Sequence, residues 1–322
     1  MKFRTEIDIK PWSNQIDYSD TILSLGSCFA TNMAQRLDER KFKVCNSPTG
    51  ILFNPASIAS TVELMAKRYR ITENDIFECN GTYSSYLFHS HLSHADKAQA
   101  IEQMQHGIIR GAEALSRATH IIITLGTAWV YRLLETGRIV ANCHKQPSAL
   151  FSRELLSVEQ IIDNLETIIS HTSAQLIITI SPVRHIGEGM EENSLSKALL
   201  RVAVDEFVRR HPERTQYFPS YEILIDDLRD YRFYTDDLVH PSTMAVDYIA
   251  EKFFEASLSA KTKQRMEQVE RIVRAARHRA QNPASEQHKT FCRKQLEAIK
   301  AVNDVDLSKE SDYFEQMLQI NL

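Results

Sequence analysis

One serine and one aspartate–histidine pair have the residue types and spacing for acyl transfer. Ser27 lies in residues 21–30 (TILSLGSCFA), where an apolar, strand-like run passes through Gly26 into a helical pattern. Gly26 allows a tight turn, and a helix N-terminus directs free N–H groups and a partial positive charge towards the serine oxygen. Such a position presents a hydroxyl nucleophile and stabilises an oxyanion. A purely structural role for Ser27 as the helix N-cap is the alternative.

The base and its orienting carboxylate are predicted in residues 234–242 (YTDDLVHPS). Asp237 and His240 are three residues apart, so the carboxylate can reach the imidazole, fix its tautomer and stabilise its protonated form. Pro241 restricts His240 to extended backbone conformations and suits the first turn of a following helix. Spacing alone leaves Asp236 as an alternative partner, and a surface turn with a helix cap as the structural alternative.

The bulk composition is that of a folded protein without a strong charge bias. The 322 residues include 38 basic and 42 acidic side chains, a formal net charge of −4. This balance argues against nucleic acid or a membrane surface as partner, and no apolar run reaches the roughly 18 residues of a membrane span. The first residues lack the apolar core of a signal peptide, and five scattered cysteines without a CxxC pair indicate neither a disulfide framework nor a cysteine zinc site. We therefore expect a cytoplasmic protein.

The strands and helices that the sequence predicts must position these groups. Strands are expected at 21–25, 42–45, 120–125, 176–180 and 215–218, and helices at 28–40, 56–69, 157–170 and 192–210. This alternation predicts an α/β fold, a parallel sheet with helices on both faces. Reactive groups gather at the carboxyl ends of strands in such sheets. The segments at these ends supply Ser27, Gly50, Asn54, Thr127 and His240.

A change of pattern near residue 258 divides the chain. Residues 1–258 hold the predicted sheet, and residues 259–322 are expected to form a helical C-terminal extension. Within it, residues 260–302 are predicted to form a helical hairpin that packs on the core or mediates self-association. A basic nucleic-acid arm is disfavoured because acidic residues alternate with the basic ones.

Five motifs in a fixed order carry a resemblance to a known family. They are LGSCFA at 25–30, TLGTAWVY at 124–131, VANCHK at 140–145, ISPVRH at 180–185 and the stretch 230–242. Over roughly residues 1–260 the chain resembles the GSCFA family, which is similar to the SGNH (GDSL-type) hydrolases, and this implies a flavodoxin-like three-layer α/β/α sandwich. The resemblance implies Ser27 as nucleophile, with Asp237 and His240 as its relay. It also implies that the N–H groups of Ser27 and Gly50 form the oxyanion hole.

One position departs from the superfamily pattern. SGNH hydrolases usually carry Gly-x-Asn-Asp after the third strand, and that asparagine donates to the oxyanion, whereas this chain has GTAW at 126–129. Loss of one such donor typically costs about 100- to 1000-fold in turnover. Asn142, Asn54 and His144 are the residues expected to replace it.

Cys28 is the alternative nucleophile, because a thiolate is more reactive than a hydroxyl. Adjacent positions on a helix are rotated by about 100°, so only one of Ser27 and Cys28 can face His240. The resemblance favours Ser27. Cys28 is then expected to point away from the site and to pack between the helix and the sheet.

Further polar residues are expected around the pocket. As substrate-binding side chains we predict Asn54, His89, Thr127, His144, Arg184 and His185. Arg184 and His185 directly follow a strand end, which suits them to bind an anionic or polar group. A zinc site at His89, His91 and His94 is an alternative, with loop histidines at the pocket entrance as the simpler explanation. We expect no metal and no cofactor.

The predicted function is ester hydrolysis by a serine-dependent acyl-enzyme mechanism. Through the resemblance, the expected substrate is an acetyl or short acyl ester of a small molecule or a carbohydrate. Two alternatives stay open: an O-acyltransferase with an alcohol acceptor, and a binding or scaffold protein with little turnover. Formation of homo-oligomers through the C-terminal helices is also expected.

Overall fold

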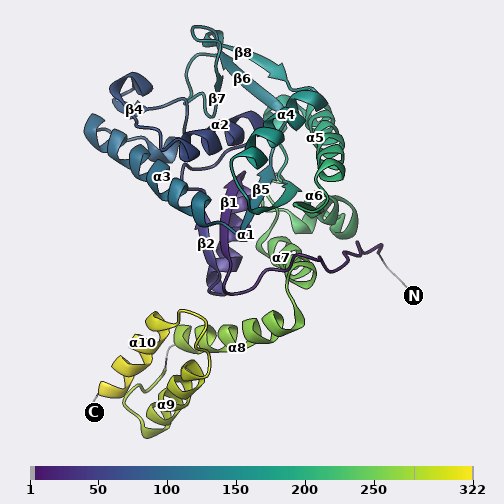
Figure 1. Ribbon diagram of the computed structural model, residues 1–322. Helices are drawn as coiled ribbons and strands as arrows, with labels where there is room; N and C mark the ends of the chain where they lie inside the picture. Colours follow the sequence, from purple (N-terminus) through teal and green to yellow (C-terminus); the bar gives the residue numbers. More distant parts are fainter. Residues whose placement is uncertain (1–3, 279, 321–322) are drawn as a thin grey trace.

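The computed structural model describes residues 4–278 and 280–320, which form an α/β body and a smaller helical bundle (Figure 1). A parallel sheet in the body contains β1 (Thr21–Gly26), β2 (Lys43–Asn46), β5 (His120–Leu125), β9 (Gln175–Ile180) and β10 (Thr215–Phe218). Its spatial order is β10-β9-β5-β1-β2. Renumbered along the chain, these five strands have the order 2-1-3-4-5, which is flavodoxin-like. The expected fold class is confirmed.

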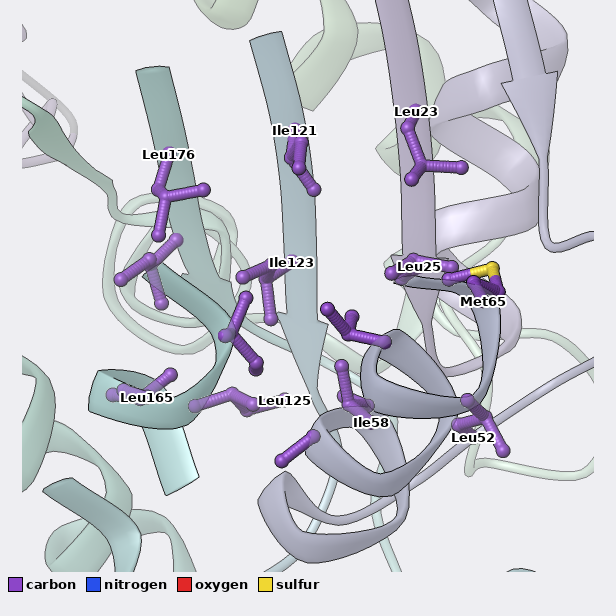
Figure 2. Close-up of a cluster of buried hydrophobic side chains, with 14 of the residues drawn as sticks. Leu23, Leu25, Leu52, Ile58, Met65, Ile121, Ile123, Leu125, Leu165 and Leu176 are labelled. Carbon is purple, nitrogen blue, oxygen red and sulfur yellow. The ribbon is translucent and has the colours of Figure 1, made fainter. Parts of the chain in front are cut away.

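Helices cover both faces of this sheet because its strands are apolar on both sides. In β1, Leu23 and Leu25 face one layer and Ile22 faces the other. The first layer contains α2 (Pro55–Ala66), α3 (Lys97–Arg117), α4 (Val158–Ser170) and α5 (Met190–Arg210). Figure 2 shows Leu25 beside Met65 of α2. The opposite layer contains α1 (Cys28–Glu39) and α7 (Thr243–Ser257). Before α7 in the chain come the short α6 (Ser220–Glu222) and a π-helical turn at Ile223–Leu228.

The turn between β1 and α1 requires glycine. Gly26 has a φ of +132°, and a Cβ atom there would lie 2.2 Å from the carbonyl oxygen of Thr124 in β5. Ser27 follows as the N-cap residue with an extended backbone, and its N–H donates to the same Thr124 oxygen (3.1 Å). The chain therefore leaves β1 close against β5, where the strand order reverses and where open α/β sheets bind ligands.

A small antiparallel sheet lies between β5 and α4 in the sequence. It contains β6 (Trp129–Leu133), β7 (Ile139–Val140) and β8 (Phe151–Leu155) in the order β7-β6-β8. Neither this sheet nor the hairpin of β3 (Phe77–Cys79) and β4 (Thr82–Ser84) is among the strands expected from the sequence. In Figure 1 the small sheet lies at the opposite end of the molecule from the C-terminal bundle.

The C-terminal bundle has three helices, α8 (Ala260–Arg277), α9 (Glu286–Lys300) and α10 (Ser308–Gln319). The first two correspond to the predicted hairpin, and α10 packs on both. Ion pairs join the bundle to the body: Arg40 Nε lies 2.7 Å from Glu270, and Lys41 Nζ lies 2.7 Å from Glu310. None of the helices in the described part of the chain is long and apolar enough to cross a membrane.

Candidate active site

The carboxyl ends of the parallel strands open into a pocket of about 720 Å³. The parallel-sheet side of the pocket contributes Cys28, Asn54, Thr127, Arg184, His185 and His240. The small antiparallel sheet contributes Trp129, Tyr131, Val140 and Phe151. Residues from distant parts of the chain therefore meet at the edge of the sheet where the sequence predicted a site.

Asp237 and His240 form an ordered pair in this pocket. His240 Nδ1 donates to Asp237 Oδ2 at 2.7 Å. Asp237 Oδ1 accepts the Thr235 hydroxyl (2.6 Å) and the backbone N–H groups of Val239 (2.8 Å) and His240 (3.0 Å). These donors, with Thr235 contributing most, hold the pKa of the Asp237 carboxyl well below its usual range. The ionised carboxylate, and not that of Asp236, fixes Nδ1 as a donor and leaves Nε2 as the basic nitrogen of the ring.

Arg184 supports the loop that carries this pair. Its Nη1 donates to the carbonyl of Leu238 (3.2 Å), its backbone N–H donates to the carbonyl of Val239 (3.2 Å), and its guanidinium lies 4.1 Å from the ring centre of Tyr234. Leu238 has a φ of +57°, a left-handed conformation that leucine rarely adopts. Arg184 lines the pocket as expected, but these contacts indicate a positioning role and not capture of an anion.

The structure places Cys28, and not Ser27, on the wall of the pocket. Ser27 is fully buried, its Oγ has no hydrogen-bond partner among the described residues, and it does not line the pocket. Cys28 is partly exposed and lines the pocket together with His240. The expectation that Cys28 points away is therefore wrong. The reason is that Ser27 still has an extended backbone (φ −67°, ψ 174°) and is not yet part of the helix. The side chains of Ser27 and Cys28 therefore point to opposite sides, as successive side chains do in a strand.

The Cys28 thiol is protonated at neutral pH in this environment. Burial raises its pKa, and the N–H groups at the start of α1, with the ammonium of Lys197, oppose the effect only in part. The Asp237 carboxylate also raises the pKa of the thiol, which places the pair within electrostatic reach of Cys28. Nucleophilic attack by this thiol therefore needs a base to remove its proton.

The expected oxyanion hole is not formed by the predicted N–H groups. The Ser27 N–H donates to the Thr124 carbonyl (3.1 Å), and the Gly50 N–H donates to the Ser47 carbonyl (2.8 Å). The first bond extends the β1–β5 pairing by one residue, and the second closes a turn. Because both donors are occupied within the protein, their assignment to the oxyanion hole is wrong for this structure.

Asn54 is better placed to supply an oxyanion donor. Its Oδ1 caps α2 by accepting the N–H of Ser57 (2.8 Å), which fixes the amide plane, and Asn54 lines the pocket. No other described residue bonds its Nδ2, which is therefore available to a ligand. The segment lies across the ends of β1 and β5, since the Leu52 N–H donates to Gly26 (2.8 Å) and the Gly126 N–H donates to Phe53 (2.7 Å).

Asn142, Thr127 and His185 also line the pocket, as predicted. The Asn142 Oδ1 accepts the backbone N–H of His144 (2.7 Å), and its amide nitrogen is held by no other described residue. The hydroxyl of Thr127 pairs with that of Ser196 (3.0 Å) inside the protein, so it supports the wall. Burial lowers the pKa of His185 to about 4, and its ring is therefore neutral at neutral pH.

The other predicted histidines lie outside the pocket. His144 Nε2 lies 2.8 Å from the Ser85 carbonyl oxygen, and the Nδ1 atoms of His89 and His91 lie 3.1 Å apart. The Nδ1 of His94 accepts a backbone N–H at 2.9 Å. Within residues 4–278 and 280–320, no three or more His, Cys, Asp or Glu side chains are arranged to hold a metal ion. The structure therefore does not bring His89 or His144 into this pocket.

Lys197 is a buried cation beneath the pocket that the sequence analysis missed. Its Nζ donates to the carbonyls of Gly126 (2.6 Å) and Ser181 (2.7 Å), which join the ends of β5 and β9. Burial lowers the pKa of its ammonium to about 7. Lys197 shares the buried stripe of α5 with Leu200 and Val204 as well as the polar Asn193 and Ser196, and a charged side chain on the buried side of a helix was the available signal.

Two family models match parts of this chain. The model of the GSCFA family matches residues 21–253, which include the parallel sheet and the pocket. The model described as GSCFA domain protein, C-terminal domain, matches residues 269–320, within α8 to α10 and the segments between them. A search of curated proteins gave no match. The chain belongs to the GSCFA family.

Proposed function

We propose that this pocket hydrolyses an ester through a covalent thioester on Cys28. The observation that carries the proposal is the presence of Cys28 and His240 in one pocket, with His240 oriented by the ionised Asp237. The position of Cys28 at the N-terminus of α1 adds a partial positive charge where the oxyanion develops. The resemblance to SGNH hydrolases supports the reaction class but assigns the nucleophile to Ser27, whereas the pocket geometry favours Cys28.

The reaction then has two balanced halves. His240 Nε2 takes the thiol proton while Sγ of Cys28 attacks the ester carbonyl carbon, and the resulting oxyanion is held by Asn54 Nδ2. The carbon–oxygen bond to the alcohol breaks, and His240 returns the proton to the leaving alcohol. Water, deprotonated by His240, next attacks the thioester. The carboxylic acid leaves, and the proton on His240 restores the thiol of Cys28.

Hydrolysis of an activated ester tests this function. The purified protein should release p-nitrophenol from p-nitrophenyl butyrate with saturable kinetics, and His240→Ala should lower kcat by at least about 100-fold because the general base is lost. His89→Ala is the matched control, since His89 lies outside the pocket. Equal rates for the wild type and His240→Ala would contradict the proposal.

Asn54→Ser separates the oxyanion donor from the helix cap. Serine caps helices as well as asparagine does but has no amide N–H groups. We therefore expect a nearly unchanged thermal melt and a kcat lower by about 100- to 1000-fold, the cost of one oxyanion donor. Asn142→Ser is the control and should lose much less. The reverse order of the two effects would assign the donor to Asn142.

A further inference from the structure

We propose that the pocket selects a neutral, apolar acyl chain of about six to eight carbons, longer than acetyl. This inference rests on the proposed function, because it places the acyl carbonyl at Cys28. It is carried by the composition and charge of the walls and by the size of the pocket. The leaving alcohol is not constrained by these features.

One wall is an aromatic surface built by the small antiparallel sheet. Trp129 and Tyr131 are two residues apart in β6, so their side chains project from the same face. Phe151 begins β8, which pairs with β6, and all three residues line the pocket. Ile51 and Phe53, from the loop after β2, add apolar surface. These apolar and aromatic side chains give an alkyl chain van der Waals contact, although polar side chains such as Gln146 and Ser148 also line the pocket.

The charges around the pocket favour a neutral acyl group. None of the described residues that line it is Asp or Glu. Its arginine, Arg184, already donates to the Leu238 carbonyl and lies over the Tyr234 ring. His185 is neutral at neutral pH. Arg153, whose guanidinium lies 3.6 Å from the Trp129 ring centre, is also already engaged within the protein. An acyl chain that ends in a carboxylate would therefore lose its hydration without gaining an unengaged arginine in return.

The size of the pocket exceeds what an acetyl group needs. Its volume of about 720 Å³ lies within the range of pockets that enclose drug-sized ligands. An acetyl ester would leave most of the aromatic wall in water. Each additional methylene group buried against that wall is worth up to about fourfold in affinity. The specificity constant should therefore rise with chain length until the pocket is full.

A series of p-nitrophenyl esters with a constant leaving group tests the inference. We expect kcat/KM to rise at least about 50-fold from acetate to hexanoate, because four methylene groups enter the pocket. Trp129→Ala and Phe151→Ala should each lower kcat/KM for hexanoate much more than for acetate, which removes most of this preference. Leu134→Ala, on an exposed residue outside the pocket, should retain it. Acetate as the best substrate, or a preference unchanged in both wall variants, would overturn the inference.

A binding measurement separates failure of the inference from failure of the proposed function. The chain contains two tryptophans, Trp12 and Trp129. In Trp12→Phe, intrinsic fluorescence therefore reports on the pocket alone, and titration with uncleavable octanamide should change it at a far lower concentration than acetamide. Chain-dependent binding without ester cleavage would sustain the inference and reject the proposed hydrolysis. Equal binding of the two amides would reject the inference even if esters are cleaved.

Discussion

Cys28→Ala should lower kcat for ester hydrolysis at least about 10³-fold, because the proposed thioester cannot form without the Cys28 thiol. The fold should survive, since the side chain lies on the pocket wall and alanine suits the first turn of a helix. The measurement is the steady-state rate with p-nitrophenyl hexanoate beside a thermal melt by circular dichroism. The residual rate reports what binding and the oxyanion donor achieve without the thiol.

Ser27→Ala is the matched control for this prediction. The Ser27 hydroxyl is buried and bonds to no residue that the structure describes, so its removal breaks no hydrogen bond and leaves no described partner unsatisfied. We expect activity within about threefold of the wild type and a melt that is unchanged or slightly higher. Loss of activity in Ser27→Ala, with full activity in Cys28→Ala, would restore the serine that the family resemblance indicates.

Asp237→Asn should lower kcat by a large factor, up to about 10⁴ as in other triads. The asparagine oxygen can still accept the N–H groups of Val239 and His240, so the turn is largely kept. Its amide group, however, presents a donor to His240 Nδ1, which favours the wrong tautomer of the ring and removes the carboxylate that stabilises its protonated form. Measurement of kcat and of the thermal melt of the purified variant tests whether activity is lost while the fold is kept.

Two neighbouring variants act as controls for Asp237. Asp236→Asn should retain most activity, since Asp236 is exposed and it is Asp237 that bonds to the ring. Thr235→Val should have an intermediate effect, because the Thr235 hydroxyl donates to Asp237 Oδ1 and helps to orient the carboxylate towards His240. A larger loss in Asp236→Asn than in Asp237→Asn would contradict the observed pairing.

The parallel sheet could be predicted because its strands are short and apolar. The run at 120–125 (HIIITL) is buried along its whole length in β5, and the run at 175–180 (QLIITI) forms β9. The small sheet escaped prediction because charged side chains interrupt β6 (WVYRL) and β8 (FSREL), and β7 has only two residues. The alternation in Trp129–Leu133 was the available signal, since period-two patterns indicate strands.

The acid–base pair could be predicted because it depends on local chain only. Asp237 and His240 meet within one turn, and spacing of three residues is enough to suggest it. The nucleophile could not be chosen from sequence, because the choice depends on where the extended backbone of β1 ends. Ser27 keeps the strand conformation, and this one residue decides that Cys28 faces the pocket. The position of Asn54 in the pocket likewise depends on tertiary structure, because backbone hydrogen bonds to Gly26 and Gly126 fix the loop that carries it.

Mass spectrometry of the acyl-enzyme tests the central claim most directly. The wild-type protein is mixed with p-nitrophenyl hexanoate, quenched in acid during the first turnovers, and digested for peptide sequencing. We predict one hexanoyl group on Cys28, as a thioester that neutral hydroxylamine removes, and none in Cys28→Ala. A hexanoyl ester on Ser27 that survives hydroxylamine, or turnover without any acylated residue, would contradict the account.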